Sequence, residues 1–237
     1  MRCILIGAGG HGRVVLDILA SSSAHEVVGF VDSDGSLTGQ MVNGIPILGQ
    51  PKALTELRAE HALEGAVIAV GDNRARSRLA EQAERAGLTL VSAIHHSANI
   101  AANAELGCNV VVAAGALVCA HCRIGDSAIL NTGCIVDHES MIGRGVHICP
   151  GAKLAGRVIV DAGAFVGIGA TVIQNVKIGR DAIIGAGAVV IHDVAPHSTV
   201  VGVPARQVKP QASEFAAQGW ALPNWEHADR AAVRAAR

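Results

Sequence analysis

The segment Asp137-His138-Glu139 places an imidazole between two carboxylates. A neutral imidazole can take a proton from a reacting group, and a neighbouring carboxylate can orient the ring and stabilise its charged form. Adjacent residues of a strand point to opposite faces, so Glu139 can serve His138 only where the backbone turns or bulges. We therefore interpret His138 as a candidate general base and Glu139 as its partner, provided that a corner lies at this place.

A second group of candidate residues lies near the N-terminus. Gly7, Gly9 and Gly12 satisfy the pattern G-x-G-x-x-G, and Asp32 follows twenty residues after Gly12. Glycine lets the backbone approach a phosphate at the first turn of a helix. The pattern is compatible with a dinucleotide site, a nucleotide-sugar site or a purely structural turn. About 90 residues precede the repeat described below, which is enough for only half of a dinucleotide-binding fold, so a nucleotide-sugar site is favoured.

The first part of the chain, residues 1–90, predicts a small α/β domain. Buried strands are expected over residues 4–6, 27–31 and 66–70, with helices over residues 13–20 and 74–86. Strands that alternate with helices predict a parallel, Rossmann-like sheet, with ligand groups at the carboxyl ends of its strands.

The second part has a period of six. Every sixth residue from Ile94 to Val190 is aliphatic, over seventeen consecutive positions. The residue four positions later is mostly Ala or Cys, and glycine often follows the aliphatic residue directly. This pattern predicts a solenoid in which the aliphatic residue points into a narrow core and a small residue fills a tight corner.

The repeat resembles that of the hexapeptide-repeat acyltransferases. The resemblance implies a left-handed parallel β-helix with three hexapeptides per coil, so we expect five to six coils over the repeat at residues 94–194. We assign residues 91–206 to this domain and residues 207–237 to a C-terminal tail. It also implies a homotrimer, because such prisms pack against sister prisms.

Three ordered motifs narrow the resemblance. I-G-A-G-G-H-G at residues 6–12, G-D-N-x-x-R at 71–76 and N-T-x-x-x-x-x-H-E at 131–139 resemble the sialic acid O-acetyltransferase family of sugar acyltransferases. This family includes bacterial N-acetyltransferases that act on nucleotide-linked 4-amino sugars with acetyl-CoA as co-substrate. The resemblance makes these residues substrate-binding candidates: Gly9, His11, Asp32, Asp34, Gly71 and Asn73.

The period places further residues beside His138. One coil later stands Gly156, about 4.8 Å away, and its backbone N–H is a candidate donor to the oxyanion of an acyl-transfer reaction. His147 matches a second histidine of the family, and we expect it at the acetyl-CoA pocket. The cofactor-binding candidates are His147, Gly156, Ile168, Ala186 and Arg206, the last in a turn that resembles the family's closing turn.

The spacing Cys119-x-x-Cys122 is compatible with a redox or zinc site, but the hexapeptide repeat disfavours this interpretation. Cys119, Cys122, Cys134 and Cys149 occupy two recurring slots of the hexapeptide, so we expect core packing and direct attack in a ternary complex without an acetyl-cysteine. Zinc would suit the histidine-rich γ-class carbonic anhydrases, which share the solenoid, but the histidine spacing does not resemble that class. We therefore expect no metal.

Composition excludes several other classes of protein. A net charge of −1 gives no basic surface for nucleic acid, and the longest apolar stretches are too short for a membrane span. No signal peptide is recognisable, which favours the cytoplasm. The sequence predicts an acetyl-CoA-dependent N-acetyltransferase for a nucleotide-linked amino sugar of surface-glycan biosynthesis. O-acetylation of a sialic acid or related sugar, or a non-catalytic nucleotide-sugar scaffold, are the alternatives.

Overall fold

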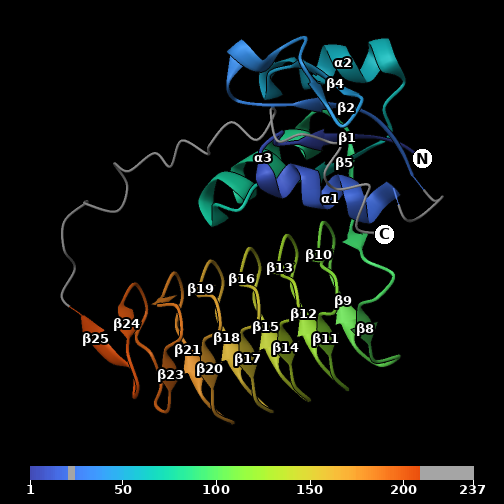
Figure 1. Ribbon diagram of the computed structural model, residues 1–237. Coiled ribbons are helices and arrows are strands. Elements are labelled where there is room, and N and C mark those ends of the chain that lie inside the picture. Colours follow the sequence, from blue (N-terminus) through green and yellow to red (C-terminus); the bar gives the residue numbers. More distant parts are fainter. Residues whose placement is uncertain (21–24, 209–237) are drawn as a thin grey trace, which may run out of the picture.

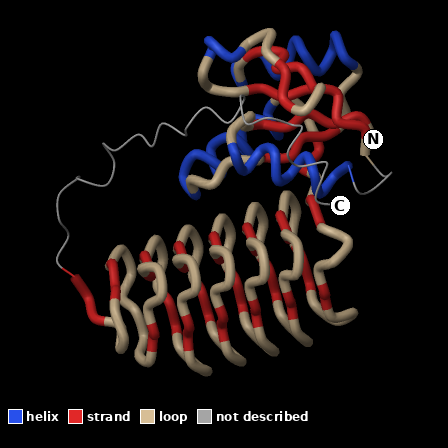
Figure 2. Tube along the Cα trace, in the orientation of Figure 1, coloured by secondary structure: helices blue, strands red, loops and turns tan. Residues whose placement is uncertain are grey.

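The structure is a computed structural model that describes residues 1–20 and 25–208 of the 237-residue chain. An α/β unit at the N-terminus lies on one face of a long three-sided prism built from the following residues (Figures 1 and 2).

The α/β unit has a sheet in the order β3-β4-β2-β1-β5-β6. Its strands are parallel except for the antiparallel pair β3 and β4. The central strands β1 and β5 are almost wholly buried, as their uninterrupted aliphatic residues require. The elements are β1 (Arg2–Ile6), α1 (Gly10–Ala20), β2 (Glu26–Val31), η1 (Gly35–Leu37), β3 (Met41–Val42), β4 (Ile45–Gly49), η2 (Pro51–Ala53), α2 (Leu54–His61), β5 (Gly65–Ile68), α3 (Asn73–Arg85) and β6 (Thr89–Leu90).

Some boundaries differ from the prediction. Helix α1 begins at Gly10, three residues before the expected start, so His11 lies in its first turn. Strand β5 ends at Ile68 rather than residue 70. Helix α2, strand β6 and the β3–β4 hairpin were not predicted, although Asn43 and Gly44, both with positive φ, are the residues that a tight hairpin turn favours.

The prism is a left-handed parallel β-helix, as the resemblance predicts. Two-residue strands recur every six residues from β7 to β23, and each pairs with the strand one coil away. They form three sheets, here called the first (β7, β10, β13, β16, β19, β22, β24 and β25), the second (β8, β11, β14, β17, β20 and β23) and the third (β9, β12, β15, β18 and β21). Their bounds are β7 (Ala93–Ile94), β8 (Asn99–Ile100), β9 (Glu105–Leu106), β10 (Val111–Val112), β11 (Leu117–Val118), β12 (Arg123–Ile124), β13 (Ile129–Leu130), β14 (Ile135–Val136), β15 (Met141–Ile142), β16 (His147–Ile148), β17 (Lys153–Leu154), β18 (Ile159–Val160), β19 (Phe165–Val166), β20 (Thr171–Val172), β21 (Lys177–Ile178), β22 (Ile183–Ile184), β23 (Val189–Val190), β24 (Thr199–Val201) and β25 (Arg206–Val208).

The core of the prism follows the six-residue pattern. From Val112 onward the periodic aliphatic residues are almost fully buried, and the small residues at the corners are fully buried. Ile94, in contrast, is 44% exposed because it belongs to the first coil, which has no coil before it. Narrow coils leave room for one aliphatic side chain per hexapeptide, which accounts for the scarcity of aromatic residues.

The period ends near the C-terminal end of the prism. Val194 pairs with Ile178 and Val200 with Ile184, sixteen residues apart instead of eighteen. The chain then turns back, and β25 pairs antiparallel with β24. The remaining tail, residues 209–237, lies outside the described residues.

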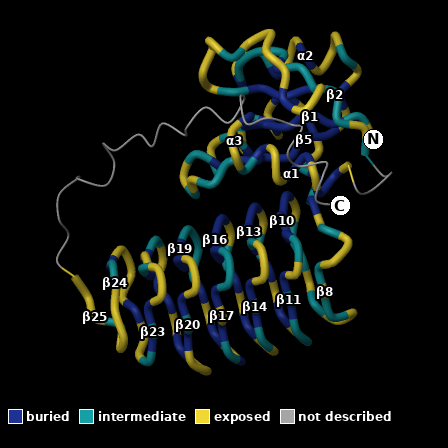
Figure 3. The backbone as a smooth tube through the Cα atoms, viewed as in Figure 1, coloured by how far each residue is buried: buried dark blue, intermediate teal, exposed yellow. Residues whose placement is uncertain are grey.

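The α/β unit and the prism share buried surface. The outward side chains Val111 and Ile129 of the first sheet are fully buried and belong to one apolar cluster with Val15 and Leu16 of α1. Both residues of β10 and of β13 are buried, as the colours of Figure 3 indicate. Within the described residues, no helix is long and apolar enough to cross a membrane.

Candidate active site

His138 stands at a corner of the prism, in the turn between β14 and β15. Its backbone N–H donates to the side chain of Asp137, and Glu139 has a positive φ of 60°. The turn therefore supplies the corner that the sequence argument requires, and the adjacent side chains meet. His138 Nδ1 lies 3.1 Å from Glu139 Oε2, which leaves Nε2 directed away from the carboxylate.

Gly156 lies directly beneath the His138 ring. A Cβ at this position would collide with the Nε2 and Cε1 atoms of the ring, so only glycine lets the imidazole lie against the backbone. Gly156 is buried, and its N–H has no acceptor among the residues that the structure describes. An unpaired buried N–H beside an imidazole is the arrangement that an oxyanion site needs.

Arg157 extends this site and was missed in the sequence reading. Its guanidinium lies 3.6 Å from Glu139 Oε2 and donates to Asn175 one coil further on. The hydrogen bond with His138, and to a smaller degree the charges of His138 and Arg157, hold the pKa of Glu139 below its usual range. Residues eighteen positions apart lie in neighbouring coils, so the spacing that places Gly156 beside His138 also places Arg157 beside Glu139. The contact of Arg157 with Glu139 was therefore predictable from the six-residue period.

His147 occupies a different place, between the prism and the α/β unit. It belongs to β16 of the first sheet, whereas His138 follows β14 of the second sheet. Its Nδ1 lies 3.3 Å from the carbonyl oxygen of Gly71, and its Nε2 lies 3.2 Å from Nδ2 of Asn131. We expected His147 at the acetyl-CoA pocket, yet no contact joins it to His138 in this chain.

A cavity of about 600 Å³ opens beside His147, here called the interdomain cleft. Residues from both parts of the chain line it: Gly71, Asp72, Asn73, Arg74, His147, Gly163, Phe165, Asp181 and Ile183. The His147 ring meets Phe165 edge to face, with the ring centroids 5.3 Å apart. Among the sequence candidates, the cleft thus brings Gly71, Asn73 and His147 together.

His11 reaches the same region from the first turn of α1. Its ring centroid lies 6.4 Å from that of His147, and its buried Nε2 has no hydrogen-bond partner in the described part of the chain. Burial, with a smaller contribution from the charge of Arg76, lowers the pKa of His11 to about 4. The same two causes, in the same order, lower the pKa of His147 to about 4. Both rings are therefore neutral at physiological pH.

The glycine-rich loop is shaped by close packing. Gly7 has a φ of 112°, and a Cβ on Gly12 would collide with the carbonyl oxygen of Gly7. Gly9 is exposed, and a Cβ there would meet no atom. Gly7 and Gly12 are therefore required by close packing of the backbone, whereas the space around Gly9 is open to solvent.

The two aspartates after β2 have structural partners in the structure. Asp32 accepts the N–H groups of Ala8 and Asp34, at 2.8 Å and 2.9 Å, and so ties the glycine loop to the end of β2. Asp34 caps η1 through Ser36, whose hydrogen bonds lower the pKa of the Asp34 carboxyl. Both lie near the open Gly9, at the carboxyl edge of the sheet.

Asn73 and Arg76 connect the two parts of the chain. Asn73 Nδ2 donates to the carbonyl oxygens of Gly163 and Ala164, and its Oδ1 accepts from Arg76. The side chain expected to bind substrate is therefore engaged within the protein. Arg76, the last residue of the G-D-N-x-x-R motif, was not among the predicted site residues and is fully buried beneath the cleft.

The remaining cofactor candidates lie apart from His138. Ile168 and Ala186 are exposed at successive positions of the corner between the first and second sheets, whereas His138 stands at the corner between the second and third. Arg206 is exposed on β25, at the end of the prism. A single chain does not bring these residues to the His138–Gly156 corner.

The cysteines follow the packing prediction with one exception. Cys122, Cys134 and Cys149 are buried, but Cys119 is partly exposed and is not a core residue. Burial raises the pKa of all four thiols, to about 12 for Cys134 and Cys149. Protonated thiols are poor nucleophiles. Residues 1–20 and 25–208 contain no cluster of three or more His, Cys, Asp or Glu that could hold a metal ion.

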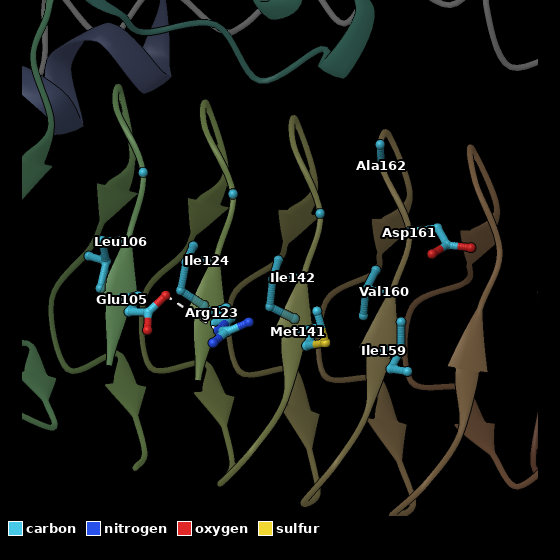
Figure 4. A pocket seen from close by; sticks show the side chains of 13 residues that line it. Glu105, Leu106, Arg123, Ile124, Met141, Ile142, Ile159, Val160, Asp161 and Ala162 are labelled. Carbon is cyan, nitrogen blue, oxygen red and sulfur yellow. Dashed lines mark ion pairs between the residues drawn. The ribbon is translucent and has the colours of Figure 1, made fainter. Parts of the chain in front are cut away.

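A groove of about 440 Å³ also runs along the third sheet (Figure 4). Met141 and Ile159 are exposed in it, and an ion pair between Arg123 and Glu105 lies at one end of it. The groove contains none of the candidate residues, so we do not assign the site to it.

Comparison with known proteins places the chain in a family. Residues 2–83 match the PglD N-terminal domain family. The structure is similar to perosamine N-acetyltransferase from Caulobacter crescentus, solved with CoA and GDP-perosamine and with one histidine replaced by asparagine. That protein is 40% identical, with a TM-score of 0.84 over 89% of this chain and 98% of the other.

Two further relatives agree. The acetyltransferase domain of PglB from Neisseria gonorrhoeae, solved with acetyl coenzyme A, is 35% identical, with a TM-score of 0.81 over 87% of this chain and 98% of the other. UDP-N-acetylbacillosamine N-acetyltransferase of Bacillus subtilis is 37% identical over 110 residues, which are 46% of this chain and about half, 50%, of the length of that curated relative. With the glycine loop, the prism and the His-Glu corner, this similarity shows that the chain belongs to the hexapeptide-repeat sugar N-acetyltransferases.

Proposed function

We propose that this protein transfers the acetyl group of acetyl-CoA to the amine of a nucleotide-linked amino sugar used in surface-glycan biosynthesis. The observation that carries the proposal is the His138 ring lying on Gly156, next to a free backbone N–H. The relative from Caulobacter crescentus, solved with CoA and GDP-perosamine, supports the same chemistry.

His138 is the general base of the proposed reaction. Glu139 binds Nδ1 of the ring, so Nε2 takes a proton from the acceptor amine as the amine nitrogen attacks the thioester carbonyl carbon. The carbonyl oxygen becomes an oxyanion and accepts the N–H of Gly156. When the tetrahedral intermediate collapses, the C=O bond forms again and the C–S bond breaks. The CoA thiolate leaves and takes the proton from the His138 imidazolium, so the products are the N-acetyl sugar and the CoA thiol, and His138 is neutral again.

Direct attack is favoured over an acetyl-cysteine. The raised pKa values of the Cys119 and Cys122 thiols keep both protonated, and Cys134 and Cys149 are buried. Amine and thioester therefore meet in one ternary complex.

The α/β unit, residues 1–90, would hold the nucleotide sugar, and residues 91–206 would hold acetyl-CoA. Gly9, His11, Asp32 and Asp34 surround the carboxyl edge of the parallel sheet, where ligands bind in such folds. The interdomain cleft next to His11 would receive the sugar, with Gly71 in its wall.

The separation of the candidate residues supports a homotrimer. His147, Ile168 and Ala186 lie on or beside the first sheet, a prism face away from His138. If neighbouring prisms pack side by side, His138 and Gly156 of one copy face these residues of the next, with the pantetheine arm between the copies and Arg206 at its nucleotide end. We place the enzyme in the cytoplasm, where its six free cysteines stay reduced.

An acceptor comparison tests the function. A thermal-shift panel of UDP, GDP, dTDP and CMP sugars first selects the nucleotide, and CoA release is then measured with its 4-amino sugar and with the matching 4-hydroxy sugar. We expect release only with the amine. Release with the hydroxyl acceptor alone would show O-acetylation, and an absence of acetyl-CoA binding by calorimetry would leave a non-catalytic scaffold.

A further inference from the structure

Arg76 is the largest fully buried side chain in the described part of the protein, with 0% of its surface exposed. It lies in the first turn of α3, where its N–H donates to the carbonyl oxygen of Asp72. A buried guanidinium normally pairs with a carboxylate, because an unpaired charge is costly to remove from water. Within the described residues, no ion pair joins Arg76 to a carboxylate.

Backbone carbonyls take the place of a counter-ion. Nε donates to Ser127 O at 2.7 Å, and Nη2 donates to Gly145 O at 2.8 Å and to Asn73 Oδ1 at 2.7 Å. Nη1 donates to the carbonyl oxygens of Val70 and Gly71, both at 3.0 Å. The guanidinium therefore joins the end of β5 and the start of α3 to two coils of the prism.

The carbonyl of Gly71 is shared with His147. A carbonyl oxygen has two lone pairs, and here it accepts from Nη1 of Arg76 and from Nδ1 of His147. Since a carbonyl only accepts, the ring proton must be on Nδ1. Nε2 is then the acceptor, in agreement with its 3.2 Å contact to the amide nitrogen of Asn131.

We propose that Arg76 is a positioning residue that fixes the orientation and the tautomer of His147 through the Gly71 carbonyl they share. The proposal rests on the proposed function in one respect: it assigns His147 to the acetyl-transfer site. The geometry itself is independent of the substrate.

The charge of Arg76 also favours the neutral form of the His147 ring, because it lowers the pKa of His147. Burial lowers the pKa of Arg76 to about 10, which leaves the side chain protonated at neutral pH. Carbonyls carry no net charge, so they do not cancel the field of the guanidinium at the rings of His147 and His11. The other charged residues facing the cleft are Asp72 and Arg74 at the start of α3 and Asp181 from the prism. A carboxylate in place of the carbonyl cage would instead have favoured the charged imidazole.

Two substitutions separate the roles of geometry and charge. Arg76→Lys keeps the charge but loses the planar fork, and Arg76→Gln loses the charge. We expect the lysine variant to show a mixture of His147 tautomers, and the glutamine variant to protonate His147 at a higher pH than the wild type. Arg78→Lys, on the exposed side of the same helix, is the matched control and should change neither property.

The measurement is ¹⁵N NMR of histidine-labelled protein from pH 4 to 8, with the His147 signals assigned by His147→Gln. Wild type should show the Nδ1–H tautomer and no protonation of His147 above about pH 5. An Nε2–H tautomer in the wild type overturns the proposal even if neither Arg76 variant folds. An unchanged tautomer and titration in both folded variants overturns it as well.

Kinetics supply a second measurement. In the folded lysine variant kcat should fall about tenfold while KM for both substrates changes less than about threefold, because positioning acts on the reacting geometry. The NMR result stands even if the protein acetylates a different acceptor, so failure of the proposed function and failure of this inference are distinguishable.

Discussion

His138 and His147 are nine residues apart in the chain, but different physical effects hold their rings. His138 stands at a corner with 47% of its side chain exposed, next to the carboxylate of Glu139 and the guanidinium of Arg157. His147 is buried below the α/β unit, and its partners are a carbonyl and an amide. The first ring therefore lies among charged side chains at the surface, whereas burial keeps the second ring neutral.

The comparison shows two ways of building a site on one repeat. The His138 corner needs only the solenoid, because its partners Gly156 and Arg157 come from the next coil. The His147 environment needs the packing of two separate parts of the chain. The following experiments test this division, from the largest expected effect to the smallest.

Replacing His138 should cause the largest loss. His138→Ala removes the proposed base and should lower kcat by about a thousandfold, the range seen for general bases. His192→Ala, an exposed histidine at the same slot three coils later, is the control. Turnover of the alanine variant within threefold of wild type would exclude His138 as the base.

Acid should destabilise the interdomain cleft. Unfolded histidine binds a proton near pH 6.5, whereas folded His11 and His147 bind one only near pH 4. As the pH falls from 6.5 towards 4, the two histidines are protonated in the unfolded state before they are protonated in the folded state. The free energy of unfolding is therefore highest above pH 6.5 and decreases over this range. At pH 5 the loss is about 2 kcal/mol for each ring.

Urea unfolding at pH 7.5 and pH 5 measures this loss. The His11→Asn, His147→Asn double variant should lose most of the pH dependence, while His138→Ala should keep it. If the free energy of unfolding of wild type were equal at the two pH values, the neutral state of the two rings would be refuted.

Gly156→Ala should disturb the corner without unfolding it. The new methyl group would displace the His138 ring, and we expect kcat to fall about a hundredfold with little change in melting temperature. Gln174→Ala, in the same column one coil further on, provides the comparison. If the Gly156→Ala variant kept the kcat of the wild type, the His138 ring would not need to lie against Gly156.

Glu139→Gln should have the smallest effect. The carboxylate is exposed, so its contact with His138 is screened by water, and the glutamine amide can still bind the ring. We expect kcat/KM to fall by about three- to tenfold. A loss as large as that of His138→Ala would mean that the two residues act as one catalytic unit.

The six-residue period made much of the fold predictable from sequence. It placed the aliphatic core, the small corner residues and the column that joins His138 to Gly156, because each coil repeats the geometry of the one before. In the α/β unit, local pattern located β1, β2 and β5, but missed α2, whose helical pattern lacks a strong apolar face. Helix α1 begins three residues before the expected start, directly after the loop in which Ala8 N–H donates to Asp32, a residue far along the chain.

The contacts that the sequence could not predict join distant residues. Asn73, a substrate-binding candidate, donates to the carbonyl oxygens of Gly163 and Ala164 in the prism, about ninety residues away. No spacing rule connects Arg76 to Ser127 or His147 to Gly71, since these pairs arise only when the α/β unit packs on the first sheet.

The sequence by itself determined the repeating part of this protein: a narrow aliphatic prism, its corners, and an imidazole above a glycine. Because the period is fixed, residues eighteen positions apart in the chain lie next to each other in neighbouring coils. Only the tertiary structure decided the cleft, where burial, with a smaller contribution from the charge of Arg76, holds two histidines neutral. The physical reason is that burial and unpaired charge depend on which surfaces meet, and the packing of one domain on another is not periodic.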